Sequence, residues 1–344
     1  MKVLFIGLGG IGQRHLRNLQ LLVGTKLQVL AYRELNRGQV INEKLGIDEG
    51  ADLESRFGIQ VFNDLDLALA EKPLIAFICN PTSKHMAAAR SAADQGCHLF
   101  IEKALSDSMN GVDDLVALVS SKKLVSMVGY QMRFHPCLLE LERILKEGSV
   151  GRVLAVNLEV GEHMPDWHKY EDYRTLYAAR KDLGGGVIVS QIHELDYLQW
   201  LFGAPSSVYA VGGHLSSLDI DVEDVASILM TCTYGGQKIP VHLHQDYLQR
   251  PPTRGCKVLG DKGVVYLDLM ANTVLHYDEL GKVALSLKFS DFARNQLFLG
   301  EMRHFLSCVE TGEETCIPLA DGAISLKTAL AAKQSIETGQ VVYL

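Results

Sequence analysis

Short apolar runs, separated by segments of helical periodicity, occupy the first part of the chain. The runs lie at residues 2–6, 28–32, 74–78, 98–101 and 125–129. Segments that end near Leu22 and that cover residues 84–95 have the spacing of amphipathic helices. Strands that alternate with helices predict βαβ units on a parallel sheet with both faces covered. Residues 36–58 are polar and irregular, and a helix is expected within them.

The pattern changes near residue 151 to longer runs in which apolar and polar residues alternate. These runs lie at 153–160, 208–214, 225–233, 238–246, 256–259 and 264–267, and helices are expected at 187–202, 302–311 and 320–338. Alternation indicates antiparallel strands with one face buried and the other exposed or used at an interface. The predicted fold is α/β. A doubly wound parallel sheet covers residues 1–128, and an α+β domain with a large, mostly antiparallel open sheet covers 129–344.

A glycine motif, GLGGIG, lies between the first apolar run and the first helical segment. GxGxxG alone is weak evidence, but the strand–turn–helix setting is what a dinucleotide fingerprint requires. Gly7 would permit the tight turn, Gly9 would let the backbone approach a pyrophosphate, and Gly12 would let helix and strand pack closely. The helix N-terminus at Gly10 and Ile11 would offer free N–H groups and the positive end of the helix dipole. The motif therefore predicts NAD or NADP binding.

The residues after the second apolar run should distinguish the two cofactors. Glu34 could hydrogen-bond the ribose 2′-hydroxyl of NAD, whereas Arg33 and Arg37 could hold the 2′-phosphate of NADP. Surface charges on a loop would explain the same residues. The choice stays open here, with NADP at least tolerated.

Composition and charge narrow the function classes. The chain has 344 residues, 47% of them hydrophobic, and a formal net charge of −8, so no basic surface for nucleic acid or anionic membranes is expected. No apolar stretch reaches the ~18 residues of a membrane span, and no signal peptide is evident. Seven scattered cysteines without a CxxC pair predict neither disulfides nor a structural metal site. We expect a cytoplasmic protein that binds no metal.

Further motifs follow the strands in order. They are Asn80-Pro81 with His85, Glu102-Lys103-Ala104, Gly129 to Phe134, Gly184-Gly185-Gly186, and His193-Glu194-Leu195-Asp196. Together with the glycine motif, this set resembles the Gfo/Idh/MocA family of NAD(P)-dependent oxidoreductases, over essentially the whole chain. The family's E-K-P segment lacks its proline here. Arg-His after the glycines, Trp167-His168 and the segment 246–252 resemble a subgroup often associated with surface-polysaccharide and unusual-sugar pathways.

The resemblance implies where the cofactor binds. The expected cofactor-binding residues are Gly7, Gly9, Gly10, Ile11, Gly12, Arg33, Asn80, Pro81, His85, Glu102, Lys103 and Gln131. Lys103 ends a strand at the carboxyl edge of the sheet, where ligands bind in open α/β folds. Its ammonium could hydrogen-bond a substrate hydroxyl and assist its proton as hydride leaves. The resemblance also implies a homodimer or homotetramer formed through the open sheet.

His193 is the second expected catalytic residue. It follows the three glycines in a helical pattern that places Ser190 and Asp196 on the same face, and histidine suits acid–base work in alcohol–ketone interconversion. Family members often carry an aspartate three or four residues earlier, but Val189 and Ser190 stand there. Either the proton relay is reduced to Lys103 and His193, or another acid substitutes, or the reaction differs.

The run 167–180 is rich in aromatic and charged residues. Its side chains could stack on a pyranose and bind its hydroxyls or a phosphate, or they could pack the loop against its own domain. The expected substrate-binding residues are Arg133, Trp167, Tyr173, Arg174, Ser190 and Asp196.

These expectations favour an oxidoreductase that moves a hydride between NAD(P) and a ring hydroxyl or keto group of a sugar, cyclitol or activated sugar. One alternative is a catalytically inactive NAD(P)-binding sensor or scaffold, which the missing aspartate allows. A second alternative is a reductase of an imine or enone. Retention of both Lys103 and His193 favours an enzyme.

Overall fold

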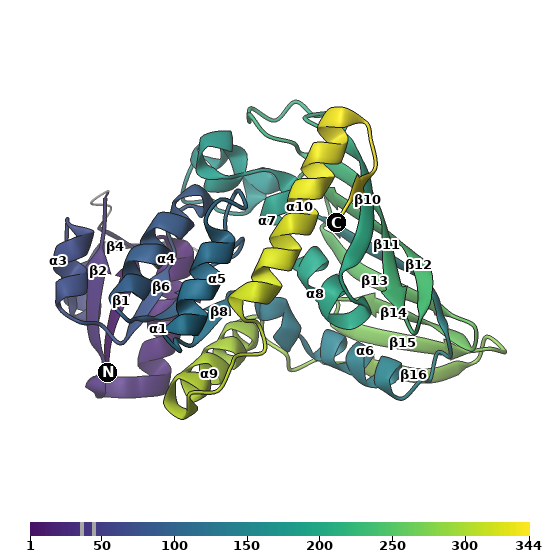
Figure 1. Ribbon diagram of the computed structural model, residues 1–344, viewed down its shortest axis with the longest axis horizontal. Coiled ribbons are helices and arrows are strands. Elements are labelled where there is room, and N and C mark those ends of the chain that lie inside the picture. The colour runs from purple at the N-terminus through teal and green to yellow at the C-terminus, as the bar shows by residue number, and fades with distance from the viewer. Residues whose placement is uncertain (35–37, 43–45) are drawn as a thin grey trace.

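A parallel sheet forms the first half of the computed structural model, which describes residues 1–34, 38–42 and 46–344 (Figure 1). Six strands lie in the order β5 (Ile59–Phe62), β2 (Gln28–Tyr32), β1 (Lys2–Ile6), β6 (Ile75–Ile78), β7 (His98–Ile101) and β8 (Ser126–Val128). Every neighbouring pair is parallel. If the six strands are numbered 1 to 6 in chain order, their order across the sheet is 3-2-1-4-5-6, which is the doubly wound order of dinucleotide-binding domains. The predicted doubly wound sheet is confirmed.

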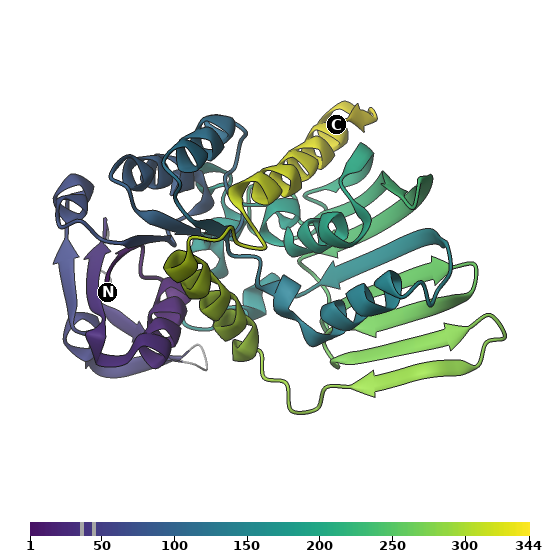
Figure 2. The same ribbon diagram turned by 60° about the horizontal axis from the view of Figure 1, so that its bottom comes forward.

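Helices cover both faces of this sheet, so its central strands, β1 and β6, are buried on both sides. Those from the first half are α1 (Gly10–Val23), α2 (Leu53–Phe57), α3 (Leu65–Ala70), α4 (His85–Asp94) and α5 (Val112–Ser121). Another comes from far along the chain. Helix α9 (Asn295–Thr311) packs beside α1 (Figure 2). Its Phe305 ring lies 5.4 Å from that of Phe100. The boundary at 128/129 remains a prediction, but α9 lies against the first sheet although it belongs to the second part of the sequence.

Residues 38–62 differ from the prediction. Strands β3 (Gln39–Ile41) and β4 (Ile47–Asp52) form an antiparallel hairpin, followed by α2 and β5. The Asp52 carboxylate accepts the N–H of Ser55 at 2.8 Å and starts α2, and left-handed Gly58 (φ 63°) ends it. The helix expected within 36–58 is therefore wrong apart from α2, and the sequence analysis missed β5.

The second half is built on a nine-stranded sheet. Its order is β16 (Val283–Lys288), β15 (Thr273–Asp278), β14 (Gly263–Asp268), β13 (Thr253–Gly260), β9 (Val153–Gly161), β12 (Gln237–Asp246), β11 (Val225–Tyr234), β10 (Pro205–Gly213) and β17 (Val342–Tyr343). Only β9 and β12 pair in parallel; the other pairs are antiparallel. The mostly antiparallel sheet is as predicted, with β15, β16 and β17 in addition.

One face of this large sheet is covered and the other is open. The covering helices are α6 (Pro136–Lys146), α7 (Val187–Ser190), α8 (His193–Phe202) and α10 (Leu319–Thr338). Helix α10 runs between the two sheets (Figure 1). Val208 and Ala210 are buried beneath it, whereas Tyr209 and Val211 point to the open face. No helix of the described residues is long and apolar enough to span a bilayer.

Short 3₁₀ helices complete the connections. They are η1 (Gly24–Lys26), η2 (Thr82–Lys84), η3 (Gln131–Phe134), η4 (Met164–Asp166), η5 (Tyr173–Thr175), η6 (Tyr177–Ala179) and η7 (Lys181–Leu183). The last four lie in the segment between β9 and α7. This segment lies between the two sheets and reaches the glycine motif, where the Tyr170 hydroxyl faces Gly10.

A buried ion pair joins η3, α8 and α10. The Arg133 guanidinium donates to both oxygens of Asp196, at 2.7 and 2.9 Å, and to Asp321 at 2.9 Å. Burial disfavours the charged guanidinium, but the two carboxylates outweigh that effect and raise the pKa of Arg133. Arg133 therefore stays charged and holds α8 in place.

Candidate active site

The glycine motif forms the turn between β1 and α1. Gly7 has a φ of 95°, and a Cβ there would lie 2.8 Å from the backbone of Asn80. A Cβ at Gly12 would lie 2.5 Å from the Gly7 carbonyl oxygen. In contrast, no atom lies within 4 Å of a Cβ built on Gly9. Gly7 and Gly12 thus serve the turn and the close packing, while Gly9 faces open space.

The N-terminus of α1 is free to bind an anion. No side chain caps it, and its first turn contains no acidic residue. A cavity of about 400 Å³ lies over it, lined by Leu8, Gly9, Gly10, Gln13, Gly38, Gln39, Ile41, Tyr170 and Glu171. Uncapped N–H groups beside an open cavity fit a dinucleotide pyrophosphate. Tyr170 was missed by the sequence analysis, although it lies in the aromatic run 167–180.

The end of β2 presents a carboxylate rather than a guanidinium. The side chain of Arg33 is 5% exposed and lies 3.7 Å from the Glu54 carboxylate of α2. Glu34 is about half exposed and pairs with Lys84 of η2. Arg37 lies outside the described residues. Of the two side chains described, Arg33 and Glu34, Glu34 is the more accessible.

Two buried residues hold the loops that follow β6 and β7. The His85 ring lies 2.8 Å from the Ala104 carbonyl and 2.8 Å from the Asn80 carbonyl, so it joins the two loops. The Glu102 carboxylate lies 2.6 Å from His15 of α1. These side chains position the backbone on either side of Lys103. The Asn80 side-chain oxygen is buried with no hydrogen-bond partner in the described residues.

The Lys103 ammonium crosses from the first half of the chain to the second. It donates to the Ser190 carbonyl oxygen at 2.7 Å and to the Tyr177 hydroxyl at 2.8 Å. An ammonium has three donors, so one N–H is left for a ligand. The contact with Ser190 joins the carboxyl edge of the parallel sheet to the end of α7.

A break between α7 and α8 makes the Ser190 contact possible. The single helix expected over 187–202 is wrong, because its backbone departs from helical geometry at Gln191 (φ −101°, ψ 38°). The Gln191 amide donates to the Asp246 carbonyl at 3.0 Å, and the Gln245 amide donates to the Gln191 carbonyl at 2.6 Å. Strand β12 thus ends α7 early. The Ser190 carbonyl, at the end of α7, accepts from Lys103 instead of from the next turn.

His193 begins α8 beside this contact. Its Nε2 atom lies 3.2 Å from the Gln131 amide nitrogen, while its Nδ1 atom is buried without a partner in the described residues. With the amide donating to Nε2, the ring proton resides on Nδ1. The Ser190 hydroxyl is likewise buried and unpartnered. Unpaired buried polar groups are costly, so two of them beside a lysine indicate a site for a polar ligand.

The charge environment keeps the His193 ring neutral. Burial lowers the pKa of His193 well below 6.5, and the cations Arg254, Lys103 and Arg294 lower it further. Arg254 pairs with the buried Glu194 at 2.7 Å, so its charge is fixed beside the ring. At neutral pH the imidazole is therefore a hydrogen-bond donor and acceptor rather than an acid.

The other expected substrate residues contact protein groups in the described structure. The structure places Arg133 and Asp196 in the ion pair that holds α8, with their charges satisfied by protein. Tyr173 accepts the N–H of Asp219 at 3.2 Å, and Arg174 pairs with Asp172. Trp167 packs edge-on against the Tyr247 ring at 5.2 Å, and its indole nitrogen is buried without a partner in the described residues. Lys103, Gln131, Ser190 and His193 are the expected residues that the structure brings together.

Comparison with known protein families decides the relationship. Residues 1–130 match the family described as "Oxidoreductase family, NAD-binding Rossmann fold", and residues 138–266 match the "GFO/IDH/MocA C-terminal domain". The chain belongs to the Gfo/Idh/MocA oxidoreductase family. The family resemblance noted in the sequence is confirmed.

Similar proteins extend over the whole chain. Myo-inositol 2-dehydrogenase of Thermotoga maritima is 23% identical, over 100% of this chain and 98% of that protein. UDP-N-acetylglucosamine 3-dehydrogenase of Acidithiobacillus ferrooxidans is 24% identical, over 84% of this chain and 87% of that protein. A structure of levoglucosan dehydrogenase with NADH and levoglucosan superposes with a TM-score of 0.80 at 17% identity, covering 100% of this chain and 99% of that one. At this identity the structural likeness shows the shared Gfo/Idh/MocA fold.

This Gfo/Idh/MocA chain lacks a carboxylate at the centre of the site. Ser190 stands three residues before His193, and its side chain carries no charge. Among the contacts of the described residues, no carboxylate hydrogen-bonds or pairs with the Lys103 ammonium or the His193 ring. The side-chain group with a dissociable proton that does contact the Lys103 ammonium is the Tyr177 phenol, whose oxygen accepts a hydrogen bond from it.

Two glycine variants separate cofactor binding from packing. Gly9→Val should keep the thermal unfolding midpoint of the parent, since its Cβ meets no atom, but should weaken NADH binding at least ~10-fold, because a branched side chain faces the pyrophosphate. Gly12→Val should lower the unfolding midpoint. NADH fluorescence titration and thermal unfolding measure both. Unchanged NADH affinity in folded Gly9→Val would mean that the pyrophosphate binds elsewhere.

The protonation state of His193 is measurable by NMR. We expect its ring resonances to stay in the neutral form from pH 8 to below pH 6.5, because burial and neighbouring cations lower its pKa. The folded pKa lies below the unfolded one, so its contribution to stability is full above about pH 6.5 and is lost as pH falls further. His193→Gln assigns the resonances. A midpoint at or above 6.5 would contradict the description of the site.

Proposed function

We propose that the protein transfers a hydride between NAD(H) and a ring hydroxyl or keto group of a sugar, cyclitol or nucleotide-activated sugar. The observation that carries this proposal is the meeting of Lys103 with Ser190 and His193 at the carboxyl edge of the parallel sheet. There, the Ser190 hydroxyl and His193 Nδ1 are buried without hydrogen-bond partners among the described residues, and a polyhydroxylated ligand would supply such partners. Relatives named for inositols, UDP-N-acetylglucosamine and levoglucosan support the same substrate class.

The cofactor would lie along the carboxyl edge of the first sheet. Gly9 and the free N-terminus of α1 would bind its pyrophosphate, and Glu34 would accept a hydrogen bond from its ribose. We favour NAD over NADP, since Arg33 lies against Glu54 and Glu34 would repel a 2′-phosphate. When bound, the nicotinamide supplies or accepts the hydride.

Lys103 and His193 would act on the reacting oxygen of the substrate. Lys103 offers its third N–H, and His193 offers its Nδ1–H. Two donors directed at one oxygen stabilise the negative charge that develops there during hydride transfer. The Ser190 hydroxyl, buried beside them, would orient a neighbouring substrate hydroxyl.

No observation favours the alternatives of an inactive sensor or an imine or enone reductase. A sensor would not need unpaired buried donors beside a lysine. We also propose a cytoplasmic location, because NAD-linked metabolism and seven free cysteines suit a reducing compartment.

A substrate panel tests the proposal. Myo-inositol, scyllo-inositol, levoglucosan and UDP-N-acetylglucosamine should be assayed with NAD and NADP by absorbance of the reduced nicotinamide.

Lys103→Ala and His193→Ala should each lower kcat by about 100-fold. The loss in the double variant should be far smaller than the product of the two single losses, because both side chains act on one oxygen. Lys146→Ala, on the exposed face of α6, is the control. Full turnover in His193→Ala would move the chemistry elsewhere.

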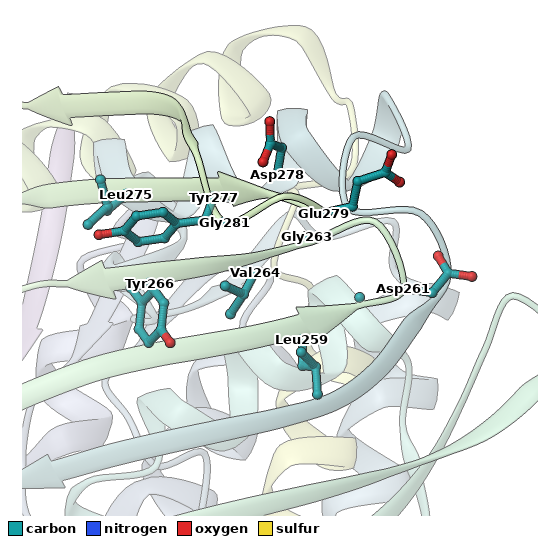
Figure 3. A pocket seen from close by; sticks show the side chains of 11 residues that line it. Leu259, Asp261, Gly263, Val264, Tyr266, Leu275, Tyr277, Asp278, Glu279 and Gly281 are labelled. Carbon is teal, nitrogen blue, oxygen red and sulfur yellow. The ribbon is translucent and has the colours of Figure 1, made fainter.

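We further propose that the open sheet face binds a second copy of the chain. It exposes apolar side chains on adjacent strands, with Leu229 53% and Val211 60% exposed. A hollow of about 720 Å³ continues this face over β13, β14 and β15, where Tyr266 and Leu259 project from the strands (Figure 3). Apolar surface of this extent on a sheet is typical of an interface between copies.

Light scattering tests the interface. The parent protein should have a mass two or four times 37.9 kDa, and Leu229→Asp should dissociate it, since a carboxylate would be buried between copies. Leu21→Asp, on exposed α1, is the matched control and should keep the parent mass. A monomeric parent, or a Leu229→Asp variant of parental mass, would refute the interface.

A further inference from the structure

We propose that the Tyr177 hydroxyl is the acid–base group of the reaction, exchanging a proton with the substrate oxygen in the role that a carboxylate would otherwise fill. This inference rests on the proposed hydride transfer and adds to it a catalytic residue. Its grounds are the contact of Tyr177 with Lys103, the placement of η6 against the glycines before α7, and the neutral state of His193.

Tyr177 is held in a fixed position. It begins η6, whose next residues Ala178 and Ala179 are buried. The Ala178 carbonyl accepts the N–H of Gly186 at 3.1 Å, and a Cβ at Gly185 would collide with the Tyr177 carbonyl. The glycines before α7 therefore leave room for η6 to pack against them, because a side chain at Gly185 would occupy that space. The ring of Tyr177 is half-buried beside Lys103 as a result.

The direction of the Lys103 hydrogen bond determines what the phenol can do. An ammonium has donors only, so in the 2.8 Å bond between them the phenol oxygen is the acceptor. The Tyr177 proton is then left to donate to another group. The ammonium lies 5.6 Å from the ring centroid, so it sits beyond the hydroxyl oxygen rather than over the face of the ring. Negative charge that forms on this oxygen is therefore neutralised where it forms.

Three neighbouring side chains, those of His193, Ser190 and Glu102, do not supply this proton. Burial and nearby cations lower the pKa of His193, which removes the imidazolium at neutral pH. The Ser190 hydroxyl is a weak acid and has no base beside it among the described residues. The Glu102 carboxylate contacts the His15 ring at 2.6 Å and accepts the backbone N–H of Lys103 at 3.2 Å, so both its oxygens already have partners. Tyr177 is the remaining acidic hydrogen in contact with the Lys103 ammonium.

In the direction of reduction, the Tyr177 hydroxyl gives its proton to the substrate oxygen. A bound reduced nicotinamide would supply the hydride to the substrate carbonyl carbon, and the carbonyl electron pair would move to oxygen. The Tyr177 O–H bond breaks as a new O–H bond forms on the substrate, leaving a phenolate paired with Lys103. Solvent, which reaches the half-buried ring, returns a proton to the phenolate. In oxidation each step runs in reverse, and the phenolate accepts the alcohol proton.

The test is Tyr177→Phe in the full-length enzyme, assayed on whichever panel sugar the parent turns over. The variant keeps the ring and loses only the hydroxyl. We expect kcat to fall about 100-fold, NADH affinity to stay within twofold, and the residual rate to rise with added imidazole buffer, which replaces the proton carrier. Tyr343→Phe is the matched control, because it makes the same change on β17, where the side chain is 81% exposed. It should keep parental turnover.

Each other outcome overturns the inference. Parental turnover in Tyr177→Phe, with Lys103→Ala inactive, removes Tyr177 from the reaction and leaves the proposed function standing. Loss of NADH binding in Tyr177→Phe, or a 100-fold loss that buffer does not relieve, assigns the hydroxyl a structural role. If the parent turns over none of the four compounds of the panel, the proposed function is refuted, and this inference is refuted with it.

Discussion

The hydrogen bonds of one half-buried ammonium, that of Lys103, join the two parts of this molecule. Lys103 stands at the carboxyl edge of the parallel sheet, yet two of its three donors are taken by Ser190 and Tyr177 of the second half. A lysine in this setting needs acceptors, and they exist only because α7 ends at Ser190 and because η6 packs on the glycines before it. The hydrogen bonds of the Lys103 ammonium thus set the geometry of the site where the two parts of the chain meet.

Two buried ion pairs fix the other side of the site. Arg133 holds Asp196 on one side of α8, and Arg254 holds Glu194 on the other. Breaking either pair would leave an uncompensated buried charge, so α8 cannot shift freely. Its first residue, His193, is therefore rigidly placed. The same Arg254 charge helps to keep that ring neutral, so the ion pairs set both the position and the protonation state of the imidazole.

Much of the fold is predictable from local pattern, and most errors arise from contacts distant in sequence. The apolar runs located five of the six parallel strands, and the roles of Gly7 and Gly12 follow from the turn itself. The break in the helix over 187–202 depends on Gln245, some fifty residues later. The ion pair of Arg133 with Asp196, two residues expected to bind substrate, is likewise invisible in the sequence. Tyr177 was noticed only as part of an aromatic run, since nothing local reveals its contact with Lys103.

The central claim is that cofactor and substrate meet at Lys103. A crystal structure of the protein with NADH and the sugar it turns over tests this most directly. We predict the nicotinamide C4 atom about 3–3.5 Å from the reacting carbon, with the oxygen on that carbon within hydrogen-bonding distance of Lys103 Nζ and His193 Nδ1. A nicotinamide bound away from Lys103, or a sugar whose reacting oxygen contacts neither side chain, would contradict the account.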